Sequence, residues 1–146
     1  MSLNDWFSKG FLVKHESSPE EMKGLFSVID RSINDSRASG LSPDGSFGFA
    51  FNAALQCAMA ALVAEGYRPG RGSHHYYAIE SLKLTLGESE KRVRMLDAAR
   101  KKRAISVYEL SGSVSDAETK EMIAFAEDLR SKLDKWLKVN HSDLVP

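Results

Sequence analysis

Residues 47–64, FGFAFNAALQCAMAALVA, form the apolar stretch that decides the fold of this chain. Asn52 and Gln56 are its only polar side chains, and its alanines let neighbouring helices approach closely. An apolar stripe at helical spacing runs through Phe47, Phe51, Leu55, Ala58 and Leu62. A helix that is apolar on nearly every side is typical of a protein interior. The stretch therefore predicts the buried central helix of a bundle.

The alternative interpretation of this stretch is a transmembrane helix, which needs about 18 apolar residues. Asn52 and Gln56 would each lie in hydrocarbon at a cost in free energy. Asp44 and Glu65 bracket the stretch, and no cluster of Lys or Arg lies directly on either flank to set an orientation. We therefore expect a core helix and no membrane association.

The composition is that of one globular domain covering residues 1–146. Hydrophobic residues make up 42% and charged residues 27% of the chain, and the formal net charge is zero, so no global charge attracts nucleic acid or membrane. The single cysteine, Cys57, lies inside the apolar stretch and is expected to be a small core residue. The N-terminus carries Asp5 and no unbroken apolar run, which predicts no secretory signal and a cytoplasmic location.

Helix signals along the rest of the chain predict an all-α, up-and-down bundle of about five helices. We expect helices over residues 19–39, 43–65, 74–86, 88–110 and 116–139. Ser18 with Glu21, and Ser115 with Glu118, have the spacing of a capping box. Residues 1–15 predict a short helix or turn that packs its aromatic side chains on the bundle, and residues 140–146 a flexible tail. No segment alternates with period two over the length of a strand, so no sheet is expected.

Two basic segments are candidates for binding an anion. The loop of residues 67–73, YRPGRGS, carries Arg68 and Arg71 and resembles no phosphate-binding motif. Residues 100–103, RKKR, include Arg100 and Lys102. Such a run is usually a solvated helix face, and the alternative is one positive patch that binds phosphates. Only Tyr67 and Tyr108 are candidates for stacking on bases there.

Polar residues within the apolar elements are the other candidates. Asn52 needs a hydrogen-bond partner, which is either a neighbouring helix or a ligand cleft shared with Glu80. His75 continues an apolar stripe and is expected to be half-buried and hydrogen-bonded, with proton transfer as the alternative role. His74 and His75 are adjacent and diverge on a helix, whereas metal ligands favour spacings of three or four, so no metal site and no cofactor are predicted.

The order of several short motifs resembles the HEPN domain, an all-α prokaryotic domain associated with nucleotides or RNA, over about residues 6–130. The matching pieces are GF at 10–11, SPEE at 18–21, Asp35, AFNA at 50–53, residues 60–68, His75, AIE at 78–80, RKKR at 100–103 and YE at 108–109. The resemblance implies a homodimer, a nucleotidyltransferase-type partner protein and RNA or a nucleotide as ligand. It also implies membership of a toxin–antitoxin or defence system.

The resemblance also implies where a nuclease site would lie, because many members are metal-independent ribonucleases with an arginine and a histidine on one helix. Arg103 matches that arginine. Ala104 stands where a polar residue is usual, and Tyr108 stands where the histidine is expected. Arg103 and Tyr108 are separated by about 140° around an ideal helix, so they do not lie side by side. A tyrosine with a pKa near 10 is a poor base at neutral pH, which predicts that catalysis is inefficient.

Three functional hypotheses follow from these observations. The first is a nucleic-acid- or nucleotide-associated module without efficient catalysis. The second is a ribonuclease toxin in which Arg103 stabilises the phosphate and Tyr108 or His75 handles the proton. The third is a helical protein-interaction domain whose basic helix binds an acidic partner.

Overall fold

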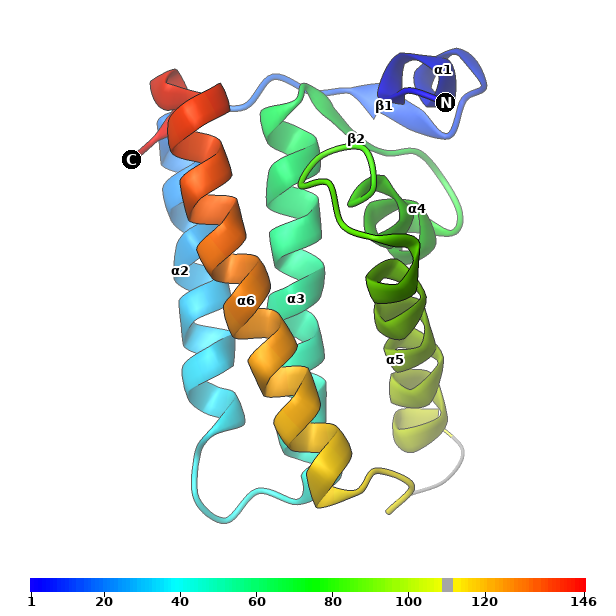
Figure 1. Cartoon of the computed structure of the whole chain (residues 1–146), viewed down its shortest axis with the longest axis vertical. Coiled ribbons are helices and arrows are strands. Elements are labelled where there is room, and N and C mark those ends of the chain that lie inside the picture. Colours follow the sequence, from blue (N-terminus) through cyan, green and yellow to red (C-terminus); the bar gives the residue numbers. More distant parts are fainter. Residues whose placement is uncertain (109–111) are drawn as a thin grey trace.

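The computed structural model is an all-α bundle, as the sequence predicts, with one small two-stranded sheet (Figure 1). It describes residues 1–108 and 112–146, and side chains for residues 1–105 and 112–146. The long helices are α2 (Pro19–Ser36), α3 (Pro43–Ala64), α5 (Glu90–Tyr108) and α6 (Asp116–Asn140). The short elements are α1 (Leu3–Ser8), β1 (Leu12–Lys14), β2 (Tyr67–Pro69), α4 (His74–Ser81) and a 3-10 turn (Ser142–Leu144).

Helix α3 is the centre of the molecule, and it contacts α2, α4, α5, α6 and β2. Figure 1 shows α2 and α6 beside one part of its surface, with α4 and α5 on the other side of α3. Ala50, Ala54, Ala58 and Ala61 are fully buried, and Cys57 is buried among them. Their small side chains let α2 and α6 pack against α3 over its length. Over the described residues, α3 is the one helix long and apolar enough to cross a membrane, and 78% of its most apolar window is buried inside the bundle.

The predicted helix starts are confirmed, with one difference in hydrogen bonding. Ser115 and Glu118 form the complete capping box. The hydroxyl of Ser18 accepts a hydrogen bond from the Glu21 backbone N–H at 3.1 Å. The Glu21 carboxylate does not return to Ser18, because it accepts from Ser17 at 2.7 Å and lies 2.9 Å from His15 Nε2.

Helix α4 is shorter than predicted and ends at Ser81 instead of residue 86. The Ser81 hydroxyl donates to the Ala78 carbonyl at 2.6 Å, and Thr85 donates to the Ser81 carbonyl at 3.2 Å. The backbone N–H groups of Leu82 and Lys83 bond three residues back, in the 3-10 pattern. Side-chain competition for carbonyls and tighter turns both weaken a continuing α-helix, so residues 82–86 form turns.

The two strands are the part of the fold that the sequence does not predict. β1 pairs antiparallel with β2, with Leu12 opposite Pro69 and Lys14 opposite Tyr67. Three residues are too few for an alternating pattern to be recognised. The strands carry the N-terminal segment across the end of α3, where a second apolar cluster forms around Trp6, Leu12, Leu62 and Tyr67 with Leu3. At the other terminus Leu144 is buried against the core, which differs from the predicted flexible tail over 140–146.

Candidate functional site

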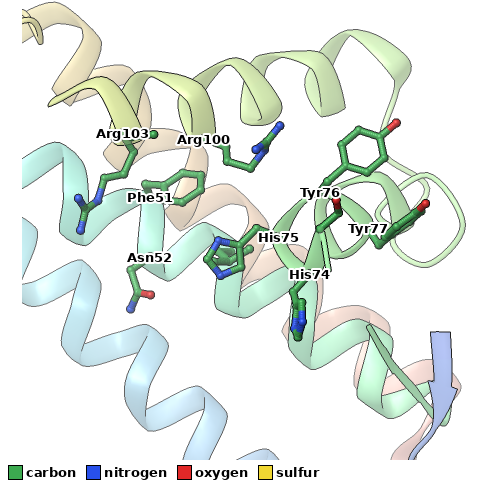
Figure 2. A pocket seen from close by; sticks show the side chains of 11 residues that line it. Phe51, Asn52, His74, His75, Tyr76, Tyr77, Arg100 and Arg103 are labelled. Atoms are coloured by element: carbon green, nitrogen blue, oxygen red, sulfur yellow. The ribbon is translucent and has the colours of Figure 1, made fainter. Parts of the chain in front are cut away.

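A cavity of about 890 Å³ lies between α3, α4 and α5, and it brings four of the predicted residues together (Figure 2). Asn52 comes from α3, His75 from α4, and Arg100 and Arg103 from α5. The remaining lining residues are Phe51, Leu55, Ser73, His74, Tyr76, Tyr77 and Ala104. Residues from three helices that are distant in sequence therefore meet in one open, basic cavity.

Arg103 reaches from α5 to the backbone of α3. Its guanidinium lies over Gly48, so that a Cβ built on this glycine would be 2.9 Å from Arg103 Nε. Figure 2 shows the side chain directed toward the side of α3 that carries Asn52. Among the described residues, no carboxylate is paired with Arg103, whereas Arg100 and Lys102 on the same helix each have a carboxylate partner.

Arg100 is held by a buried carboxylate. Its Nε donates to Asp97 Oδ1 at 2.8 Å, and Lys101 Nζ lies 3.6 Å from the other oxygen of the same group. Asp97 is 7% exposed, so the ion pair is partly protected from water. Asp97 therefore restricts the position of Arg100 while neutralising part of its charge.

His75 is exposed, which differs from the predicted half-buried and hydrogen-bonded position. The apolar stripe of α4 is continued by Ala78, Ile79 and Leu82, which are buried. Partial loss of water around the ring lowers the pKa of His75, and the positive charges of His74 and Arg100 lower it further. Its imidazole is therefore neutral at neutral pH and accessible from the cavity.

The first turn of α4 lines the cavity as well. Ser73 precedes it in a left-handed conformation, with φ of 41°, and its side chain makes no capping hydrogen bond within the described part of the chain. The backbone N–H groups at a helix start carry partial positive charge and bind anions when they are left uncapped. The positive end of this helix therefore faces the same space as Arg100 and Arg103.

Asn52 makes the contact with a neighbouring helix that the sequence offered, and it also lines the cavity. Its Nδ2 donates to Ser32 Oγ on α2 at 3.1 Å, and the residue also lines the cavity. Glu80 does not join it, because Glu80 is buried and paired with Lys83 at 2.6 Å. A second cavity of about 470 Å³ shares Asn52 and Arg103 with the first. Its other lining residues are Arg31, Ser32, Asp35, Asp44, Gly45, Gly48 and Phe49.

Several predicted residues lie elsewhere. Arg68 on β2 and Arg71 in the following loop are exposed and do not line either cavity. Lys102 faces α6, where its Nζ lies 3.5 Å from Glu118 Oε2. Tyr108 is the last residue of α5, and its side chain lies outside the described residues. Of the basic residues that the alternative of one positive patch would combine, Arg100 and Arg103 line the larger cavity.

The sequence also misses the aromatic residues of the site. Tyr67, one of the two candidates for stacking on bases, is buried beneath Lys14 in the N-terminal cluster. Tyr76 is 38% exposed and lines the cavity, because its neighbour Tyr77 packs inward on Phe11. Successive helical residues are about 100° apart, so the packing of Tyr77 on Phe11, a contact that the sequence does not show, leaves Tyr76 on the exposed side of α4.

Comparison with protein-family models and with curated proteins finds no match for this chain.

The site carries the chemistry of anion recognition. The described residues contain no cluster of three metal-binding side chains. Cys57 is buried in the core, where loss of water raises the pKa of its thiol far above the usual range, so it is not a nucleophile. Arginine forks and helix N-termini bind phosphate by charge-assisted hydrogen bonds, and exposed aromatic rings stack on bases.

Proposed function

We propose that this protein is a HEPN-like module that binds RNA or a nucleotide through the cavity between α3, α4 and α5, without efficient catalysis. The observation that carries the proposal is the meeting of Arg100, Arg103 and the uncapped start of α4 around one open cavity. All three attract phosphate. Tyr76 and His75 supply exposed rings at the same place, which suits a ligand that joins phosphate to a planar base.

The proposal includes the assembly that the HEPN resemblance implies. The protein would form a homodimer and act with a nucleotidyltransferase-type partner in a toxin–antitoxin or defence system. A symmetric dimer built around α5 would bring Arg103 of both chains to one cleft. The sedimentation behaviour of the purified chain tests the dimer separately from the ligand.

A second candidate function is a metal-independent ribonuclease that uses Arg103 with His75. It is favoured by the placement of both side chains on one cavity and by the neutral state of His75, which suits a general base. Against efficient catalysis, the Arg103 guanidinium and the His75 ring do not point toward one another in Figure 2. Binding without cleavage is therefore the better-supported function.

Replacing Arg103 by alanine tests the proposal. We expect Arg103→Ala to weaken binding of a short single-stranded RNA about tenfold, because one charge-assisted phosphate contact is lost. The slope of log affinity against log salt should fall by about 0.7 for a single-stranded ligand. Fluorescence anisotropy of a labelled RNA over a range of salt concentrations measures both quantities, and competition by AMP and ATP separates a nucleotide site from an RNA site.

The matched control is Arg94→Ala, on the same helix, since Arg94 pairs with Glu90 and lines neither cavity. The same samples, incubated without metal and run on a gel, report cleavage. Cleavage that is lost in Arg103→Ala and in His75→Ala would establish the second candidate. Absence of binding, or equal binding by the Arg103 variant, would refute the nucleotide proposal and direct the search to an acidic protein partner.

A further inference from the structure

Gly48 is the point at which α3 meets the side chain of Arg103. A Cβ built on Gly48 would lie 2.9 Å from Arg103 Nε, 3.2 Å from Cζ and 3.4 Å from Nη2. Protein side chains essentially never approach a real Cβ as closely as the first of these distances. The guanidinium therefore occupies space that every residue except glycine would fill.

The backbone at this position does not explain the glycine. Gly48 lies inside α3 and is absent from the residues with positive φ, so any residue fits its conformation. In the interior of a helix, glycine is less favourable than alanine. Gly48 therefore weakens α3 relative to alanine. Because it has no side chain, it leaves room for the Arg103 guanidinium.

That room determines where the charge of Arg103 lies. Asp44, Gly48 and Asn52 are four residues apart and therefore share one face of α3. Arg103 and Asn52 line both the larger and the smaller cavity, and Gly48 lines the smaller one. With the guanidinium resting on the helix backbone, the fork is held beside Asn52 at the junction of the two cavities. A methyl group on Gly48 would displace the Arg103 guanidinium away from α3.

We infer that Gly48 is a positioning residue for Arg103, and that it fixes the arginine fork where the ligand phosphate binds. This inference rests on the proposed function of the cavity. Ligand affinity would then depend on Gly48, a residue that has no side chain and contributes no charge.

The test is Gly48→Ala in the full-length chain, with the labelled single-stranded RNA as the probe. We expect affinity to fall about three- to tenfold, because the fork is displaced but its charge remains. The melting temperature should stay the same or rise, since alanine favours the helix and the displaced atoms are the far end of a flexible side chain. Gly24→Ala is the matched control, because Gly24 is an exposed glycine inside α2 and a Cβ there meets nothing within 4 Å.

A double-mutant cycle separates positioning from general packing. In an Arg103→Ala chain, Gly48→Ala should cause no further loss of affinity, because the group that it displaces is absent. An equal loss in both backgrounds, or wild-type affinity of Gly48→Ala while Arg103→Ala binds weakly, would overturn the inference and leave the proposed function standing. Wild-type affinity of Arg103→Ala would overturn both.

Discussion

Arg100 and Arg103 lie three positions apart on α5, and the structure places them in different surroundings. Arg100 is paired with the buried carboxylate of Asp97, whereas the Arg103 guanidinium lies on the backbone of α3 over Gly48. An arginine that already has a carboxylate partner gains less from a phosphate than one that has none. Because Arg103 has no carboxylate partner among the described residues, we expect ligand binding under the proposed function to depend mainly on Arg103, with Arg100 adding to the positive potential around it.

His75 is the residue of the cavity from which we expect a pH dependence of ligand binding. Its pKa is lowered by partial burial and by the charges of His74 and Arg100, so the folded chain binds this proton less readily than the unfolded chain. The contribution of His75 to the free energy of unfolding is therefore complete above about pH 6.5, the ordinary pKa of histidine. This contribution is lost as the pH falls below that value. A phosphate beside the ring favours the protonated form, so ligand affinity changes in the opposite direction.

We expect RNA affinity to rise as the pH falls from about 7.5 to about 5.5, with a smaller rise in His75→Gln. Anisotropy titrations at a series of pH values, at constant ionic strength, measure the effect. His141→Gln is the control, because His141 lies beside Glu65 and does not line the cavity. If His75→Gln keeps the full pH dependence, another group is responsible and His75 does not face the ligand.

At the scale of elements, α5 forms one wall of the cavity, and an ionic network holds its start. Glu88, just before this helix, is buried and accepts hydrogen bonds from Arg92 Nε at 2.8 Å and from Lys132 Nζ at 3.0 Å. Arg92 also donates to Asp128 at 2.6 Å and lies over the Phe125 ring at 4.2 Å. This ionic network connects the start of α5 to α6. The hydrogen bond that Lys132 donates to Glu88 also raises the pKa of Lys132.

Arg92→Ala should therefore destabilise the fold by about 2 to 3 kcal/mol, because it leaves the buried Glu88 with one partner. Arg94→Ala is the comparison on the same helix, since its pair with Glu90 is exposed and its loss should change stability by less than about 1 kcal/mol. Chemical denaturation of both variants gives the difference. Equal stabilities would show that the network around Glu88 does not hold α5.

The elements that the sequence predicts well are those with strong periodicity and caps. The apolar stretch at 47–64 and the capping box at Ser115 are both confirmed. The short strands and the end of α4 are not predicted, because the strands depend on pairing of residues 12–14 with residues 67–69, and the end of α4 depends on the hydroxyl of Ser81. The strand pairing joins segments that are distant in sequence, and the Ser81 hydroxyl competes locally for a helix carbonyl, so neither feature shows in the apolar periodicity.

The candidate site likewise contains residues that the sequence predicts and residues that it does not. Arg103, His75 and Asn52 are predicted as candidates because their residue types carry chemistry. Gly48 is not predicted, because its role exists only where a side chain from another helix lies over it. Tyr76 is missed for a similar reason, since its exposure follows from the packing of Tyr77.

At the scale of the whole molecule, two apolar clusters share α3. The main core includes Ala60 and Ala61, and the N-terminal cluster includes Leu62. Because one helix belongs to both, we expect a single cooperative unfolding transition.

Trp136→Phe leaves Trp6 as the fluorescent probe of the N-terminal cluster, and Trp6→Phe leaves Trp136 as the probe of the bundle. In each variant, thermal unfolding by fluorescence should coincide with loss of helix by circular dichroism. An earlier Trp6 transition would mean that the N-terminal cluster unfolds on its own.

The antiparallel pairing of β1 with β2 also links the order in which the chain folds to the shape of the cavity. The Phe11 carbonyl accepts the Gly70 N–H at 2.9 Å, and the Phe11 ring stacks on Tyr77 with centroids 4.8 Å apart. These contacts join segments about sixty residues apart, so they form only after a long loop has closed. No residue of the first fifteen lines the cavity. Because the Phe11 ring packs on Tyr77 of α4, we expect docking of the N-terminal segment to help fix α4 beside the cavity, so that the cavity takes its final shape late in folding.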